Sequence, residues 1–166
     1  MIKKRIFSLI ISICILGCVF LSCSTNEYSD ALTCKELSTA LMREISVPDG
    51  EFSQYAEEDI NFLFPTASLY SDVSIMYSKD ATDITELGVL HAENQNNSKQ
   101  LFEEAKEYIK NLQEQKREFI QNYSPEEMKK LNSAEARCFG NYVIFVVSDV
   151  NDKSNIFAKA DQLLKK

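Results

Sequence analysis

The sequence predicts an α+β fold in which one antiparallel four-stranded sheet is covered by helices mainly on one face, with further helices at the N-terminal side. Two observations predict it. Segments in which apolar and polar residues alternate occur in two pairs, and a segment with apolar residues at helical spacing follows each pair. Two strand–strand–helix units of this kind are typical of a sheet with helices packed against it. We expect residues 32–166 to form this single domain.

The start of the chain has the order of features found in a secretory leader. Three basic residues at positions 3–5 precede an apolar run over residues 6–22, and the small residue Ser22 precedes Cys23. A polar stretch follows at once. This order is typical of a bacterial signal peptide that ends at a lipid-attachment cysteine. We therefore expect residues 1–22 to be a lipoprotein signal peptide and Cys23 to carry a diacylglycerol.

The lipid would anchor the protein to the cell membrane on the extracytoplasmic face, because two acyl chains give stable attachment. The membrane is thus an expected partner, through the N-terminal diacylglyceryl cysteine. Residues 23–31 are polar and lack periodicity, which indicates a flexible tether. Cys18 is an alternative lipid site, and an uncleaved N-terminal anchor is a further interpretation.

The charge of the chain excludes one class of partner. The chain has 18 Lys and Arg against 25 Asp and Glu, a net charge of −7, and removal of the three basic leader residues would leave 15 against 25. A groove that binds nucleic acid needs positive charge. We therefore expect no nucleic acid as a partner.

Two cysteines lie beyond the leader and the predicted lipid site. Cys34 and Cys138 would pair in an oxidising compartment if they lie close together, and would otherwise be two separate buried thiols. The sequence leaves both interpretations open.

The helical elements have recognisable ends. A first helix is predicted over residues 33–47, where Thr33 and Glu36 form a capping box and Pro48 ends the helix. A second, short helix is predicted over residues 55–63.

The longest predicted helix covers residues 97–123, and a final helix is expected after the polar residues 149–154. Between them, Ser124 caps a short helix, with Pro125 at its first position and Glu127 closing a capping box. The apolar stripe of the longest helix consists of Leu101, Ala105, Tyr108, Leu112, Phe119 and Tyr123.

Alternating apolar residues define the strands. Gly140 and Asn141 between two such segments predict a two-residue hairpin turn. Gly88 lies inside another strand, where glycine is typical of a bulge or a close backbone approach. The last strand is apolar on both faces, so we expect it to be central in the sheet, with cover on both sides or a loop on one of them. The four predicted strands are residues 69–77, 84–92, 134–138 and 142–147.

An aromatic-rich segment lies between the first predicted helix and the first predicted strand. It has two interpretations: a hydrophobic contact surface for a partner, or a lid packed on the core of the domain. Its aromatic residues are Phe52, Tyr55, Phe62, Phe64 and Tyr70.

Two short patterns carry a resemblance to a known family: an E-x-G pattern at Glu86 and Gly88, and a G-x-Y-V pattern that begins at Gly140 and includes Tyr142. The layout of residues 34–165 resembles an uncharacterised domain-of-unknown-function family (number 4358) of small Gram-positive bacterial lipoproteins. Its members share a lipobox, the two patterns and a long amphipathic helix. The resemblance implies an extracytoplasmic lipoprotein without a known activity, and it assigns no role to the four pattern residues.

His91 is the only histidine, so any catalytic hypothesis has to include it. With Cys138, Cys34 or a carboxylate it would make a small hydrolase or a thiol enzyme. No catalytic signature surrounds it, and no acidic segment fits a calcium loop. We therefore expect no catalytic residue, no metal and no cofactor. The preferred hypothesis is a non-enzymatic binding or assembly module with an unknown protein or envelope partner, and the enzyme is the alternative.

Overall fold

The structure is a computed structural model that describes residues 27–46 and 51–166. The predicted signal peptide, Cys18 and Cys23 lie outside the described residues. Within the described part of the chain, antiparallel strands form one five-stranded sheet in the order β1-β2-β3-β5-β4. The strands are β1 (Phe52–Gln54), β2 (Tyr70–Ser78), β3 (Glu86–Ala92), β4 (Glu135–Phe139) and β5 (Tyr142–Val147).

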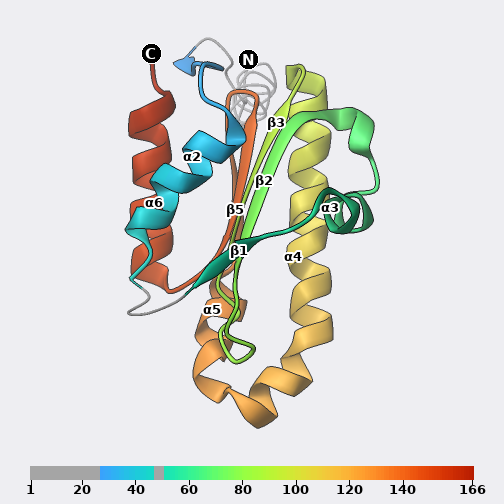
Figure 1. Cartoon of the computed structure of the whole chain (residues 1–166), viewed down its shortest axis with the longest axis vertical. Helices are drawn as coiled ribbons and strands as arrows, with labels where there is room; N and C mark the ends of the chain where they lie inside the picture. The colour runs from blue at the N-terminus through green and yellow to red at the C-terminus, as the bar shows by residue number, and fades with distance from the viewer. Residues whose placement is uncertain (1–26, 47–50) are drawn as a thin grey trace, which may run out of the picture.

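Helices cover both faces of this sheet (Figure 1). Two of them, α2 and α6, lie on one face, which we call the α6 face, and α3 and α4 lie on the other, the α4 face. None of the described helices is both long enough and apolar enough to cross a membrane. The helices are α2 (Cys34–Leu41), α3 (Glu57–Leu63), α4 (Gln95–Tyr123), α5 (Met128–Ser133) and α6 (Val150–Leu164), with short 3₁₀ helices η2 (Met42–Glu44), η3 (Ala67–Leu69) and η4 (Pro125–Glu127).

The predicted α+β fold with an antiparallel sheet is confirmed, and the sheet has one strand more than predicted. The additional strand, β1, has three residues and pairs with β2 at the edge of the sheet. It is too short for an alternating pattern. The prediction that helices lie mainly on one face is wrong, because β3 and β5 are buried on both sides. Strands that are apolar on both faces need cover on both.

Each face of the sheet has its own core. β2 divides its side chains between them, as predicted: Val73 and Ile75 face α4, whereas the Ser74 hydroxyl lies 2.8 Å from that of Ser38 on α2. The core of the α6 face includes Leu37, Leu41, Leu87, Val89, Ile144, Val146, Ile156 and Leu164. The core of the α4 face includes Ile60, Phe64, Ile75, Leu90, Leu101, Ile109, Val143 and Phe145.

The first helix has the predicted start but an earlier end. The capping box is confirmed: the Glu36 N–H donates to Thr33 Oγ1 (3.2 Å), and the Thr33 N–H donates to Glu36 Oε2 (2.9 Å). α2 ends at Leu41 and continues only as η2. The helix is shorter than predicted because the Ser46 N–H donates to Asp152 Oδ2 (2.8 Å) on α6 rather than to a helical carbonyl.

Both ends of α4 differ from the prediction. It begins at Gln95 rather than at residue 97, because the Asn94 side chain accepts hydrogen bonds from the second and third N–H groups of the helix. At the other end the predicted apolar stripe is wrong, since Phe119 and Tyr123 are 51% and 73% exposed. Those last turns pack a different side of the helix against α5.

The turn after α4 keeps its proline but not its capping box. Pro125 is at the start of η4, yet Ser124 makes no capping hydrogen bond with its side chain. Glu127 is engaged elsewhere: its carboxylate accepts from the Ile84 N–H (3.1 Å) and pairs with Lys130 (2.9 Å). A tertiary contact therefore replaces the predicted local one.

The described part of the predicted tether is held on the domain. The Ser29 N–H donates to the Leu164 carbonyl oxygen (2.7 Å), and the Lys166 N–H donates to the Glu27 carbonyl oxygen (2.9 Å). The chain from Glu27 onward thus follows the C-terminal end of α6, at the end of the molecule where the α4 N-terminus also lies (Figure 1).

Candidate functional site

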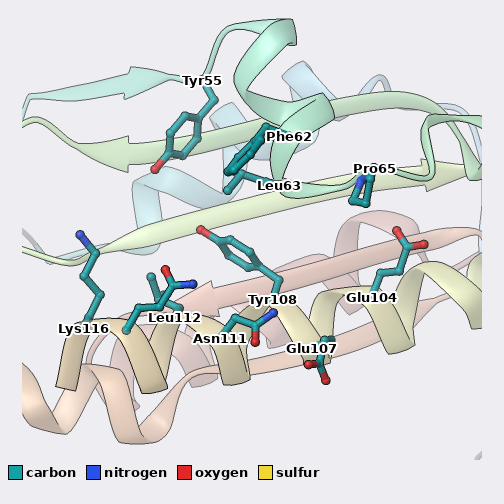
Figure 2. Close-up of a pocket in the computed structure, with 11 residues that line it drawn as sticks. Tyr55, Phe62, Leu63, Pro65, Glu104, Glu107, Tyr108, Asn111, Leu112 and Lys116 are labelled. Atoms are coloured by element: carbon teal, nitrogen blue, oxygen red, sulfur yellow. The ribbon is translucent and has the colours of Figure 1, made fainter.

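A groove of about 500 Å³ opens on the α4 face between α3 and α4 (Figure 2). Tyr55, Phe62 and Leu63 line one wall, and Tyr108 and Leu112 of α4 line the other. The groove exists because α3 has seven residues and covers only part of the length that the 29-residue α4 spans. It combines a mostly apolar lining with a few polar groups, which is the usual composition of a ligand pocket.

A buried carboxyl group lies beneath the groove. The alternation of β3 turns Glu86 toward the α4 face, where it is 4% exposed, and the Tyr108 hydroxyl donates to Glu86 Oε1 (2.7 Å). Burial raises the pKa of Glu86 to about 7, although the Tyr108 hydrogen bond and the positive charge of Lys116 oppose the rise. Glu86 therefore changes its charge near neutral pH.

The two tyrosines near this carboxyl group keep their protons. Burial, together with the charge and hydrogen bond of Glu86, raises the pKa of Tyr108 well above its usual value. Burial, and then the charges of Glu86, Tyr77 and Asp59, raise the pKa of Tyr55 to about 12. Both tyrosines act in the groove as neutral aromatic rings with a hydroxyl donor, and not as bases.

Gly88 makes room for the aromatic ring that supports Tyr108. A Cβ atom at Gly88 would lie 1.9 Å from the Phe145 ring on the neighbouring strand, far inside contact distance. The centroid of the Phe145 ring lies 5.1 Å from that of Tyr108 and 5.9 Å from that of Phe64. The ring centroids of Tyr108 and Phe64 are 5.3 Å apart. Three interlocked rings of this kind hold the groove wall in place.

Opposite charges lie at the two ends of the groove. In Figure 2, Glu104 and Lys116 lie at opposite ends of the view, with Tyr108 between them. The Oε2 atom of Glu104 is buried and has no hydrogen-bond partner in the described part of the chain. Lys116 is near enough to Glu86 for its charge to oppose the rise in the pKa of that group.

A family model matches this part of the chain. The model described as a domain of unknown function (DUF4358) matches residues 51–148, more than half of the 166-residue chain. The chain belongs to this family. The DUF4358 match runs from β1 to the end of β5 and contains the groove, whereas α2 and α6 lie outside it. No curated protein and no solved structure matches the chain.

The structure gives a place to each of the four residues of the E-x-G and G-x-Y-V patterns. Glu86 and Gly88 support Tyr108, one by its carboxyl group and the other through Phe145. Gly140 has φ +64° in the predicted two-residue turn, a backbone conformation that favours glycine. The Tyr142 hydroxyl donates to the Leu32 carbonyl oxygen on the α6 face. The first pair therefore serves the groove, and the second pair serves the fold.

The predicted aromatic surface is only partly assembled. Tyr55 and Phe62 line the groove of the DUF4358 domain, while Phe64 is fully buried in the core. Tyr70 donates to Asn61 Oδ1 (3.0 Å), and Phe52 is half-buried on the edge strand β1. The interpretation as a lid packed on the core therefore holds for Phe64, and the partner surface stays a prediction for Tyr55 and Phe62.

Sequence reasoning missed the α4 side of the groove. Tyr108 was assigned to an apolar stripe, and Glu104 and Lys116 to no site at all. One signal was available: a tyrosine in a buried stripe needs a hydrogen-bond partner for its hydroxyl. The partner, Glu86, is 22 residues away in sequence and on another element, so no local pattern identifies it.

His91 lies on the opposite face of the sheet from the groove. Its Nδ1 atom is 2.9 Å from Ser71 Oγ, its Nε2 atom is 3.2 Å from Asp30 Oδ1, and its ring stacks on Tyr142. The Ser71 hydroxyl also donates to the carbonyl oxygen of His91 itself (3.2 Å). The arrangement ties the N-terminal segment to β2 and β3.

The structure brings only one of the two cysteines of the thiol-enzyme hypothesis near His91, since the Cys34 thiol lies within hydrogen-bond reach of the His91 backbone. Cys138 is on the α4 face, and the sheet separates it from the His91 ring. Cys34 is buried on the α6 face, where burial and the nearby Asp72 raise the pKa of its thiol far above its usual value. No disulfide includes either cysteine, since they lie on opposite faces of the sheet. In the described residues, no group of three or more His, Cys, Asp or Glu side chains is placed to hold a metal ion.

Proposed function

We propose that the protein is a lipid-anchored binding module on the extracytoplasmic face of the cell membrane, without enzymatic activity of its own, and that the groove between α3 and α4 is its binding site. One observation carries the proposal: the groove has solvent-accessible aromatic walls, and interlocked rings hold the wall at Tyr108 in one arrangement. A preformed site loses little conformational entropy when a ligand binds.

The contrast between two phenylalanines supports a binding role for the groove. Phe64 is fully buried, and its ring supports that of Tyr108 in the groove wall. Phe62, two residues earlier, is 87% exposed at the groove. A phenylalanine contributes about 1.5–3 kcal/mol when it moves from water to an apolar contact. The fold leaves this free energy unused at Phe62, so it is available to a ligand.

The titratable groups of the groove favour binding over catalysis. The Glu86 carboxyl group is held by Tyr108 beneath the lining, and both tyrosines keep their protons at neutral pH. A general base has to reach the proton that it abstracts. The alternative enzyme hypothesis, which relies on His91 and a carboxylate, has its residues on the other face of the sheet.

The proposed anchor would also orient the domain. Only three residues separate Cys23 from Glu27, which is bound to the domain. At about 3.5 Å per residue, the chain from Cys23 to Glu27 spans at most about 14 Å. A lipid on Cys23 would therefore hold the C-terminal end of α6 against the bilayer and direct the end of α4 at Tyr123 away from it (Figure 1).

Tryptophan fluorescence tests this orientation, because the chain has no tryptophan. A single tryptophan in the Lys166→Trp variant should be quenched by brominated lipids, and one in the Tyr123→Trp variant should not. Equal quenching of the two variants would contradict the orientation.

Two experiments test the proposed function. Mass spectrometry of the mature N-terminus should find Cys23 with a diacylglyceryl group and without residues 1–22, and a bare Cys23 thiol behind an intact leader would rule out the anchor. For the groove, a photoreactive benzoylphenylalanine in place of Phe62 should give adducts in membranes that disappear when Leu112→Trp fills the groove. The matched control carries the same probe at the exposed Phe119, outside the groove. Equal labelling at both positions would contradict a binding role for the groove.

A further inference from the structure

We propose that the groove binds an organic cation, namely an ammonium group carried on an apolar or aromatic body. The inference rests on the proposed function, since it names the ligand class of that same groove. Three features of the groove lead to it: an unsatisfied carboxylate oxygen, aromatic walls, and an excess of negative charge.

The carboxylate oxygen is the Oε2 atom of Glu104. It is buried and has no hydrogen-bond partner among the described residues, although the side chain lines the groove. A buried carboxylate oxygen without a donor is costly, and the great majority of such atoms in folded proteins have a partner. A ligand N–H that reaches the Glu104 carboxylate from the groove would supply the missing donor, and an ammonium group supplies it together with a balancing charge.

The aromatic walls suit the same ligand. Tyr55, Phe62 and Tyr108 present their rings to one space. Ring faces carry negative charge, so an ammonium group over them is attracted, while its apolar body contacts the ring surface. Because both tyrosines keep their protons, their rings bring no formal charge that would need a counter-ion of its own.

The charge around the groove has the sign that a cation needs. Burial and the negative charges of Glu57 and Glu104 raise the pKa of Tyr70. Both carboxylates therefore contribute negative charge at the end of the groove where Glu104 lies. The negative charge of Asp59 likewise raises the pKa of Tyr55. Lys116 is the one cation among the described residues that line the groove, and it lies at the far end, where its charge acts on Glu86. An anionic ligand would meet these carboxylates, and a neutral one would leave their charge unbalanced.

Three probes of matched shape test the ligand class: phenethylammonium, phenethyl alcohol and phenylpropionate. Each is titrated into the full chain in lipid nanodiscs while backbone amide shifts are recorded. We expect phenethylammonium to bind at least about tenfold more tightly than the alcohol, with phenylpropionate the weakest and the shifts confined to the groove.

Two variants with the same chemical change locate the recognition. Glu104→Gln keeps the size of the side chain and should lower the affinity for phenethylammonium about tenfold, with little change for the alcohol. Glu103→Gln is the control, because Glu103 is exposed and outside the groove lining, and it should leave both affinities unchanged.

The outcomes separate this inference from the proposed function. If the alcohol binds as tightly as the ammonium, or if Glu104→Gln has no effect, the ligand class is wrong while the groove is still a binding site. A preference for phenylpropionate overturns the inference and assigns recognition to Lys116. If none of the probes binds, the ligand class is also overturned, and labelling at Phe62 tests the binding role of the groove independently.

Discussion

The two faces of one sheet differ in what they bury and in how completely they are covered. On the α6 face, α2 and α6 close over a core of aliphatic side chains together with the aromatic rings of Phe139, Tyr142 and Phe157. On the α4 face, one long helix and the short α3 cover aromatic rings, and they leave a groove above a buried carboxyl group. The same strand, β3, supplies Leu87 and Val89 to the first face and Glu86 and Gly88 to the second.

If the groove is the binding site that we propose, this difference separates stability from function within a small domain. The α6 face gains hydrophobic free energy from the aliphatic and aromatic side chains that are buried there. On the α4 face, the buried Glu86 carboxyl group has a pKa raised to about 7, which is costly for a fold and typical of a functional site. The family match covers the strands and the α4 face but not α2 or α6. In this chain the α6 face supports the sheet on which the groove is built.

The largest effect should follow from filling the space at Gly88. Gly88→Ala places a Cβ atom 1.9 Å from the Phe145 ring, which has to leave the ring cluster of the α4 face. Overpacking of this kind costs about 3 kcal/mol or more, so we expect a clear fall in the urea midpoint of unfolding.

A second substitution tests whether the clash is the cause. Phe145→Leu in the Gly88→Ala background should recover part of the loss, because a smaller side chain accommodates the new methyl group. If the double variant is no more stable than the sum of the two single changes predicts, the ring contact is not the reason for glycine at this position.

A smaller effect, which depends on pH, should follow from the buried carboxyl group. The pKa of Glu86 is raised to about 7 in the folded protein from its ordinary value of 4.5. Its contribution to stability is therefore present below pH 4.5 and is lost as pH rises through 7. We expect this group alone to lower the free energy of unfolding by about 3 kcal/mol over that interval.

Glu86→Gln isolates this contribution, because the amide keeps the size of the side chain and can accept from Tyr108 without titrating. Between pH 5 and pH 8 the variant should lose less stability than the wild type, and at pH 8 it should be the more stable of the two. Urea unfolding at the two pH values measures this. Parallel pH profiles would show that Glu86 is ionised in both the folded and the unfolded protein.

The sequence predicted what local chemistry determines. The capping box at Thr33, the two-residue turn at Gly140 and the alternation of β2 are confirmed, because each depends on neighbours within a few residues. The end of α2 and the cap at Ser124 were wrong where a distant carboxylate, from Asp152 or Glu127, takes part in a tertiary hydrogen bond.

The groove could not be predicted from local sequence patterns, because it also depends on contacts between residues that are distant in sequence. Phe62 and Phe64 are equivalent in composition, and only the packing of α3 leaves one exposed and the other buried. The contact between Glu86 and Tyr108 joins two elements of the α4 face. A pattern of residue types indicates that this segment packs on something, but the three-dimensional arrangement determines which part of it remains open.

The smallest effect should be local and confined to the other face. His91→Phe keeps a ring over Tyr142 but removes the hydrogen bonds to Ser71 and Asp30. We expect a loss of about 1 kcal/mol in the docking of the N-terminal segment. Hydrogen exchange of the Ser29 amide, which donates to a carbonyl of α6, should therefore become about fivefold faster.

The groove provides the internal reference for this experiment, since its amides on α4 should exchange at the wild-type rate. Glu93→Gln, which removes a charge from an exposed neighbouring position, should leave the Ser29 amide protected. If His91→Phe speeds exchange on α4 as strongly as at Ser29, the two faces are coupled, and His91 is part of the support of the groove rather than only an attachment point for the segment that follows the proposed anchor.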